Sequence, residues 1–89
     1  MKAVITVVGK DMVGILSKVA NLCADKNVNI ADVTQTIMQD YFCMIMMCDI
    51  DKMSCSFSDF VDEAEKIGKD NALSIHVMHE DIFNSMHRI

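Results

Sequence analysis

KAVITVVGKDMVGILSKVANL, residues Lys2–Leu22, changes from a strand pattern to a helix pattern and thereby decides the expected fold. Its first part, Lys2–Val8, is β-branched and apolar and stops at Gly9, which is typical of a buried strand that runs into a turn. After Asp11 the apolar residues recur at helical spacing, and we expect an amphipathic helix over about Val13–Lys26. The residues with this spacing are Met12, Ile15, Leu16, Val19, Ala20 and Cys23.

The rest of the chain repeats these two patterns. A segment rich in Val, Ile and Thr and an apolar segment flank the short turn Gln39–Asp40, so we expect a hairpin. Apolar residues at positions i, i+3, i+4, i+7 and i+10 then predict a second helix, with Gly68 near its C-terminal cap. The expected later elements are strands over Val28–Met38, Tyr41–Ile50 and about Ala72–Met78, a helix that begins near Phe57, and a short tail helix that contains Ile82, Phe83, Met86 and Ile89.

The order of the expected elements is strand, helix, strand, strand, helix, strand. This βαββαβ order predicts an α+β, ferredoxin-like sandwich with a four-stranded antiparallel sheet, and right-handed crossovers place both helices on one face. The third strand is apolar on both faces, whereas a solvated face should alternate with polar residues. We therefore expect the tail helix, another subunit, or both to cover the face without helices. The two apolar sets are Phe42, Met44, Met46, Cys48 and Ile50 on one side and Tyr41, Cys43, Ile45 and Met47 on the other.

Length and composition bound the class of protein. The chain has 89 residues, of which 52% are hydrophobic, and we expect one domain over 1–89 with a core of about 1–79 and a helical tail over 80–89. This apolar share is high for so small a domain and favours an oligomer. The net charge of −5 argues against direct nucleic-acid binding. Because we find neither a signal peptide nor an apolar run of the ~20 residues that a membrane span needs, we expect a cytoplasmic protein with reduced cysteines and no membrane contact.

The loop between the first strand and the first helix carries the best candidate site. Its two glycines allow the backbone to approach a ligand closely. Amides at the helix N-terminus suit a carboxylate, while Asp11 either caps the helix or accepts a hydrogen bond from an ammonium group. This combination suits a zwitterion such as an amino acid, but the same residues also fit a purely structural strand-to-helix junction. The candidate ligand-binding residues are Gly9, Lys10, Asp11, Met12, Val13, Gly14 and Ile15.

This loop, G-K-D-M-V-G-I, followed by L-S-K-V-A-N-L, resembles the ACT domain. Over about Met1–Met78 the chain is similar to the small stand-alone bacterial and archaeal ACT proteins related to the glycine cleavage system repressor. The family's Asp-x-x-Gly-Ile pattern falls on Asp11, Gly14 and Ile15, whereas Val13 stands where the family often has Pro. The resemblance implies a non-enzymatic metabolic or transcriptional regulator that binds an amino acid at this loop, often at the interface of a homodimer.

Other chemistries find less support in the sequence. No pattern sets a nucleophile beside a base, so we expect no catalytic residue and no cofactor. We also expect no metal site, because Cys43 and Cys48 fall on opposite faces of a regular strand, as do His76 and His79 unless the strand ends between them. Two alternatives stay open: an interaction module that docks an unidentified protein partner without a small-molecule ligand, and a carrier that binds Cu(I) or Zn through soft ligands.

Overall fold

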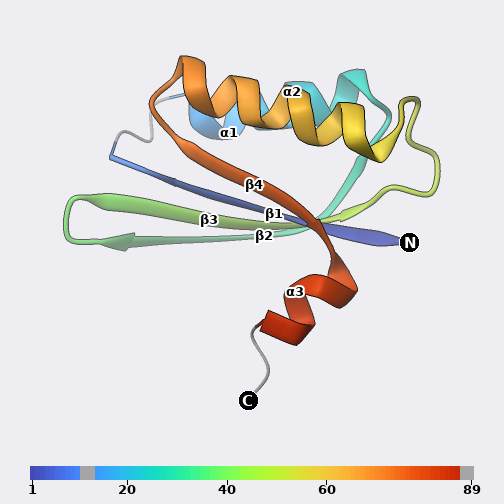
Figure 1. The fold of residues 1–89 in the computed structure, drawn as a ribbon. Helices are drawn as coiled ribbons and strands as arrows, with labels where there is room; N and C mark the ends of the chain where they lie inside the picture. The colour runs from blue at the N-terminus through green and yellow to red at the C-terminus, as the bar shows by residue number, and fades with distance from the viewer. Residues whose placement is uncertain (11–13, 87–89) are drawn as a thin grey trace.

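The protein is described by a computed structural model that covers residues 1–10 and 14–86. Within these residues the chain forms a four-stranded antiparallel sheet in the order β2-β3-β1-β4 and three helices, which confirms the expected α+β sandwich with a short C-terminal helix. The elements are β1 (Lys2–Gly9), α1 (Ile15–Asp25), β2 (Asn29–Met38), β3 (Tyr41–Asp49), α2 (Phe57–Asp70), β4 (Ser74–His79) and α3 (Glu80–Met86) (Figure 1).

The sheet has two unequal faces. Figure 1 shows α1 and α2 over one face, which we call the helix-side face, and α3 on the opposite side, which we call the open face. Side chains alternate between the faces along each strand, so Ile5 and Met46, which pair across β1 and β3, belong to the helix-side face. Val4 and its partner Met47 belong to the open face. The two apolar sets predicted for β3 therefore lie on these two faces.

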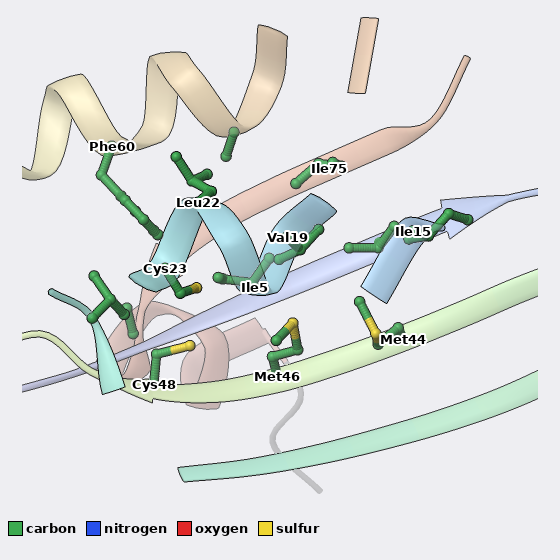
Figure 2. Close-up of a cluster of buried hydrophobic side chains, with 14 of the residues drawn as sticks. Ile5, Ile15, Val19, Leu22, Cys23, Met44, Met46, Cys48, Phe60 and Ile75 are labelled. Carbon is green, nitrogen blue, oxygen red and sulfur yellow. The ribbon is translucent and has the colours of Figure 1, made fainter. Parts of the chain in front are cut away.

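The hydrophobic core fills the space between the helix-side face and the two helices above it (Figure 2). Ile5 of β1, Met46 of β3 and Phe60 of α2 are 0% exposed. Among the described residues, no polar or charged side chain is buried. Burial of these apolar side chains is the main force that holds α1 and α2 on the sheet. The other labelled members are Ile15, Val19, Leu22, Cys23, Met44, Cys48 and Ile75.

The end of the second helix lies close to Gly68, as predicted. α2 continues through Gly68 to Asp70 and its C-cap is Asn71, so Gly68 is near the cap without being the cap itself. Gly68 is buried against the start of β4, where its carbonyl accepts a hydrogen bond from the amide of Leu73 at 2.8 Å. A Cβ atom at Gly68 would lie 2.8 Å from the Leu73 carbonyl oxygen. Gly68 is therefore needed for a close approach between α2 and the chain that enters β4, and it does not end the helix.

β2 and β3 form the predicted hairpin around Gln39–Asp40. Gln39 adopts a φ of 55°, in the left-handed region that a tight two-residue turn uses. β2 lies at the edge of the sheet, and every residue over 31–40 is exposed. A register shift between Ile30 and Asp32 marks a β-bulge early in this strand. The helices therefore leave most of β2 uncovered on both faces.

The C-terminal helix covers part of the open face. α3 follows β4 directly and contacts β1 and β4. On this face Val4 is 0% exposed and Phe83 is half-buried, whereas Ile82 is 52% exposed. Ile82 is therefore not among the tail residues that the sheet buries, and the side chain of Met86 and all of Ile89 lie outside what the structure describes.

Candidate functional site

The candidate loop joins the end of β1 to the start of α1. Gly9 is the last residue of β1, is buried, and pairs with Phe42 of β3. A Cβ atom at Gly9 would lie 2.2 Å from Cδ2 of Leu73, so the leucine side chain occupies the space that a larger residue would need. The predicted ligand-binding residues Asp11, Met12 and Val13 lie outside the described residues.

Gly14 is the N-cap of α1 and has a φ of 75°, in the left-handed region. Its carbonyl accepts a hydrogen bond from the amide of Lys18 at 3.0 Å. Within the described part of the chain, the cap makes no side-chain hydrogen bond and the first turn of α1 holds no acidic residue. The first-turn amides of a helix have no partner inside the helix, and the positive end of the helix dipole lies behind them.

The two residues that border the loop have different roles. Ile15 is 3% exposed and its side chain belongs to the core, so it can meet a ligand only through its backbone amide. Lys10 is exposed, and its ammonium group lies 5.7 Å from the centre of the Tyr41 ring, a cation–π distance. The loop therefore has the backbone amides of a helix N-terminus at one end and a positively charged side chain at the other. This arrangement favours the binding of an anionic group.

A groove of about 580 Å³ lies beside this cation on the open face. It is mostly apolar and includes Tyr41, the residue under Lys10. The sequence predicted an apolar open face on β3 but not a groove at this end of the hairpin. The lining residues are Val8, Met38, Gln39, Tyr41 and Cys43.

A second hollow, of about 420 Å³, lies at the opposite end of α1 and was not predicted. We call it the polar hollow. Asn27, at a φ of 57°, donates from its side chain to the carbonyl of Lys52 at 2.8 Å and so ties the end of α1 to the loop after β3. Asp51 lines the same hollow, and the hydrogen bond from the amino group of Met1 lowers the pKa of its carboxyl group. In the sequence, Asn27 and Asn29 indicate only the end of the first helix, so the local pattern gives no sign of this hollow.

The cysteine and histidine candidates for a metal site lie on different faces of the sheet. Cys48 lies on the helix-side face opposite Ala3, whereas Cys43 lies on the open face opposite Val8, as their spacing predicts. The histidines of β4 also fall on opposite faces, with His79 stacked on the ring of Phe57 at 4.0 Å. Over residues 1–10 and 14–86, no group of three or more His, Cys, Asp or Glu side chains is placed to hold a metal ion.

The buried thiols are not placed for nucleophilic chemistry. Cys23 of α1 and Cys48 of β3 are 1% and 0% exposed, and both belong to the core (Figure 2). The hydrogen bond with Cys23, together with burial, raises the pKa of the Cys48 thiol, which stays protonated at neutral pH. This pair therefore packs as apolar side chains.

The family assignment rests on the match of the ACT domain family model to residues 3–53, which include the candidate loop and the hairpin. The chain belongs to the ACT domain family. A UPF0237 protein of Listeria monocytogenes is 48% identical over 89 residues, with 100% of both chains covered. ACT domains are typically regulatory modules that bind small-molecule ligands and commonly dimerise, and no catalytic family is indicated for this one.

Solved structures show the same ACT fold. An ACT domain protein from Streptococcus pneumoniae superposes with a TM-score of 0.82 at 36% identity, covering 93% of each chain. A putative glycine cleavage system transcriptional repressor superposes with a TM-score of 0.67 at 25% identity, covering 85% of this chain and 43% of the other. No helix of the described residues is both long and apolar enough to cross a membrane.

Proposed function

We propose that this ACT protein is a non-enzymatic, cytoplasmic regulator that binds an amino acid at the junction of β1 and α1. The observation that carries the proposal is the N-terminus of α1, where Gly14 leaves the first-turn amides without a side-chain cap in the described residues. Lys10 adds a positive charge beside this junction. The site thus favours a carboxylate at the position where the family resemblance predicts an amino acid.

Each end of the amino acid has a proposed partner. Its carboxylate accepts hydrogen bonds from the amides around Gly14 and Ile15, because a glycine without a Cβ atom lets the ligand approach the backbone. Its ammonium group is held by Asp11, as the Asp-x-x-Gly-Ile pattern predicts. Gly9, Met12 and Val13 complete the loop that encloses the ligand. No metal or cofactor takes part.

Regulation requires that the ligand stabilise one arrangement of subunits over another. We propose a homodimer in which the neighbouring subunit helps to close the loop, so that ligand binding changes the dimer. The likeness to a putative transcriptional repressor supports a role as a metabolic or transcriptional regulator. This chain acts through its own assembly or through a protein partner, and direct contact with nucleic acid is not part of the proposal.

The second candidate function is an interaction module without a small-molecule ligand. The exposed apolar residues of the open face favour it, with Val8 40% and Ile45 42% exposed. In this case the candidate loop has a structural role only.

A calorimetric titration with the twenty amino acids tests the proposal. We expect at least one to bind at millimolar concentration or below, and Gly14→Val to weaken that binding at least about tenfold, a loss of about 1.4 kcal/mol. The reason is that valine fills the approach to the backbone and disfavours a left-handed φ.

Asn27→Val is the matched control. It places the same side chain at a similar positive φ at the other end of α1, so it imposes comparable backbone strain away from the loop. We expect it to keep the affinity of the wild type. If Asn27→Val loses binding and Gly14→Val keeps it, the ligand occupies the polar hollow. If none of the twenty amino acids binds, the sensor function is wrong and the interaction module takes its place.

A further inference from the structure

The open face keeps an apolar surface in water beside the β2–β3 hairpin. Pairing across the strands makes this surface continuous, because Val8 lies opposite Cys43 and Met38 lies opposite Tyr41. Four of its side chains are between 40% and 63% exposed, and the groove of about 580 Å³ crosses it. Continuous apolar surface on a small domain marks an interaction site. We call it the hairpin patch: Val8, Met38, Tyr41, Cys43 and Ile45.

α3 covers the other half of the same face, and the residues under it show how much burial such a cover gives. Val4 and Val8 lie four residues apart on one strand and point to the same side. Val4, on the half that α3 contacts, is 0% exposed, whereas Val8 is 40% exposed. Figure 1 shows that α3 lies under the right-hand part of the sheet and does not reach the hairpin at the left. The open face is therefore apolar along its length but covered over only one half.

The charge of the hairpin patch selects the kind of partner. The chain has a net charge of −5, yet none of the five patch residues is charged. Thr34 and Thr36, which extend the same face onto β2, are also neutral. Two acidic copies can therefore meet on the patch residues themselves without burying a carboxylate, since the acidic residues nearest to them, Asp32 on the same face of β2 and Asp40 in the turn, lie outside the patch. A second copy of this chain fits a surface of this kind.

We infer that the hairpin patch packs against α3 of a second copy in a two-fold symmetric dimer. The inference deepens the proposed homodimer by naming its surface, and it rests on that proposal. A two-fold axis parallel to the sheet and across the strands reverses the strand direction in the partner. The α3 half of each open face then meets the hairpin half of the other, and both patches are covered at once, as a self-complementary interface requires.

In this dimer the two copies of α3 form a middle layer between the two sheets. One side of α3 packs on its own β1 and β4. Its outer side carries Ile82, which is 52% exposed in the single chain and meets the partner's hairpin patch. In this orientation Glu80 and Asp81 in the first turn of α3 approach the hairpin end, which carries the cation Lys10 and, in its turn, Asp40.

The exposed edge of β2 is the competing surface for a dimer. Two β2 strands can pair edge to edge, since edge strands present unpaired backbone groups. Edge pairing would bury residues such as Ile37, which is 63% exposed and lies opposite Phe42 on the helix-side face. It would leave the hairpin patch and Ile82 in water. The patch is thus accounted for by face-to-face packing and not by edge pairing.

Sedimentation of charge-insertion variants tests the inference. We expect the wild type to dimerise and Ile45→Glu and Ile82→Glu each to raise the dimer dissociation constant at least about tenfold, because each buries an unpaired carboxylate in the interface. Both positions are exposed in the single chain, so the monomers should stay folded by circular dichroism. Ile37→Glu is the matched control with the same change on β2, and it should dimerise like the wild type.

Cys43 gives a second readout that needs no substitution. It belongs to the hairpin patch, so in the wild type its alkylation by a maleimide should slow as rising concentration drives dimer formation, while Ile82→Glu removes this protection. A dimer that Ile37→Glu dissociates and Ile45→Glu does not would overturn the inference in favour of edge pairing. A wild type that stays monomeric at high concentration would overturn both the inference and the proposed homodimer. Calorimetry measures amino-acid binding separately, so a protein that binds no amino acid can be distinguished from one that does not dimerise through the hairpin patch.

Discussion

The two faces of the sheet carry similar side chains and meet different environments. On the helix-side face Ile5 and Met46 are both 0% exposed under α1 and α2. On the open face Val4 is equally buried, but Val8 on the same strand is 40% exposed and Ile45 of β3 is 42% exposed. Burial on the open face therefore depends on what lies over each part of it, whereas α1 and α2 bury the helix-side residues of β1 and β3 along most of those two strands.

Alanine substitutions at two neighbouring residues of β3 should differ most in their effect on the free energy of unfolding. Met46→Ala should lower the free energy of unfolding by about 2–5 kcal/mol, because it removes a fully buried side chain and leaves a cavity. Ile45→Ala should lower it by less than about 1 kcal/mol, because its side chain is already partly in water. Urea unfolding in the dilute range where both variants are monomeric measures the two values. Equal losses would show that the faces do not differ as described.

The two valines of β1 test the part played by α3. Val4→Ala should lower the free energy of unfolding by about 2 kcal/mol, while Val8→Ala should lower it by less than about 1 kcal/mol. The same urea titrations measure both. A chain that ends at His79 should make the two substitutions nearly equal in effect, because Val4 then loses its cover. If Val4→Ala remains more costly than Val8→Ala in that shortened chain, α3 is not what buries Val4.

The close contact between α2 and β4 tests how tightly the helix-side face is packed. Gly68→Ala adds a Cβ atom 2.8 Å from a backbone oxygen and 3.3 Å from Cγ1 of Ile75. Overpacking costs about 1–3 kcal/mol, and the better helix propensity of alanine offsets up to about 1 kcal/mol. We expect a net loss of about 1 kcal/mol by thermal unfolding. Lys69→Ala, at the exposed neighbouring position, is the control and should change the free energy of unfolding little. If Gly68→Ala is more stable than the wild type, the contact between α2 and β4 accommodates a Cβ atom without strain.

Much of the fold followed from local patterns. The first strand, predicted over Lys2–Val8 and observed over Lys2–Gly9, the turn at Gln39–Asp40 and the two apolar sets of β3 were predicted from composition and spacing and are confirmed. The role of Gly68 was not predicted, because a glycine near a helix end looks the same in sequence whether it caps the helix or allows a strand to approach. The exposure of Ile82 also depends on how α3 docks, which is a tertiary property.

The candidate site was predictable only in part. The sequence placed Gly9 and Gly14 at the two ends of a strand-to-helix loop, and the structure has them at the end of β1 and at the N-cap of α1. It did not show that the Ile15 side chain belongs to the core or that Lys10 lies over Tyr41, because both follow from how distant elements pack. Contacts between residues far apart in the chain have no signature in local spacing.

Amide hydrogen exchange with and without the tightest-binding amino acid tests the central claim most directly. The account predicts slower exchange at residues 9–17, because the ligand accepts hydrogen bonds from the first-turn amides of α1. It also predicts little change at residues 27–29 and 49–52, which line the polar hollow at the other end of the helix. Protection confined to 27–29 and 49–52, with residues 9–17 unchanged, would contradict the claim that the β1–α1 junction is the ligand site.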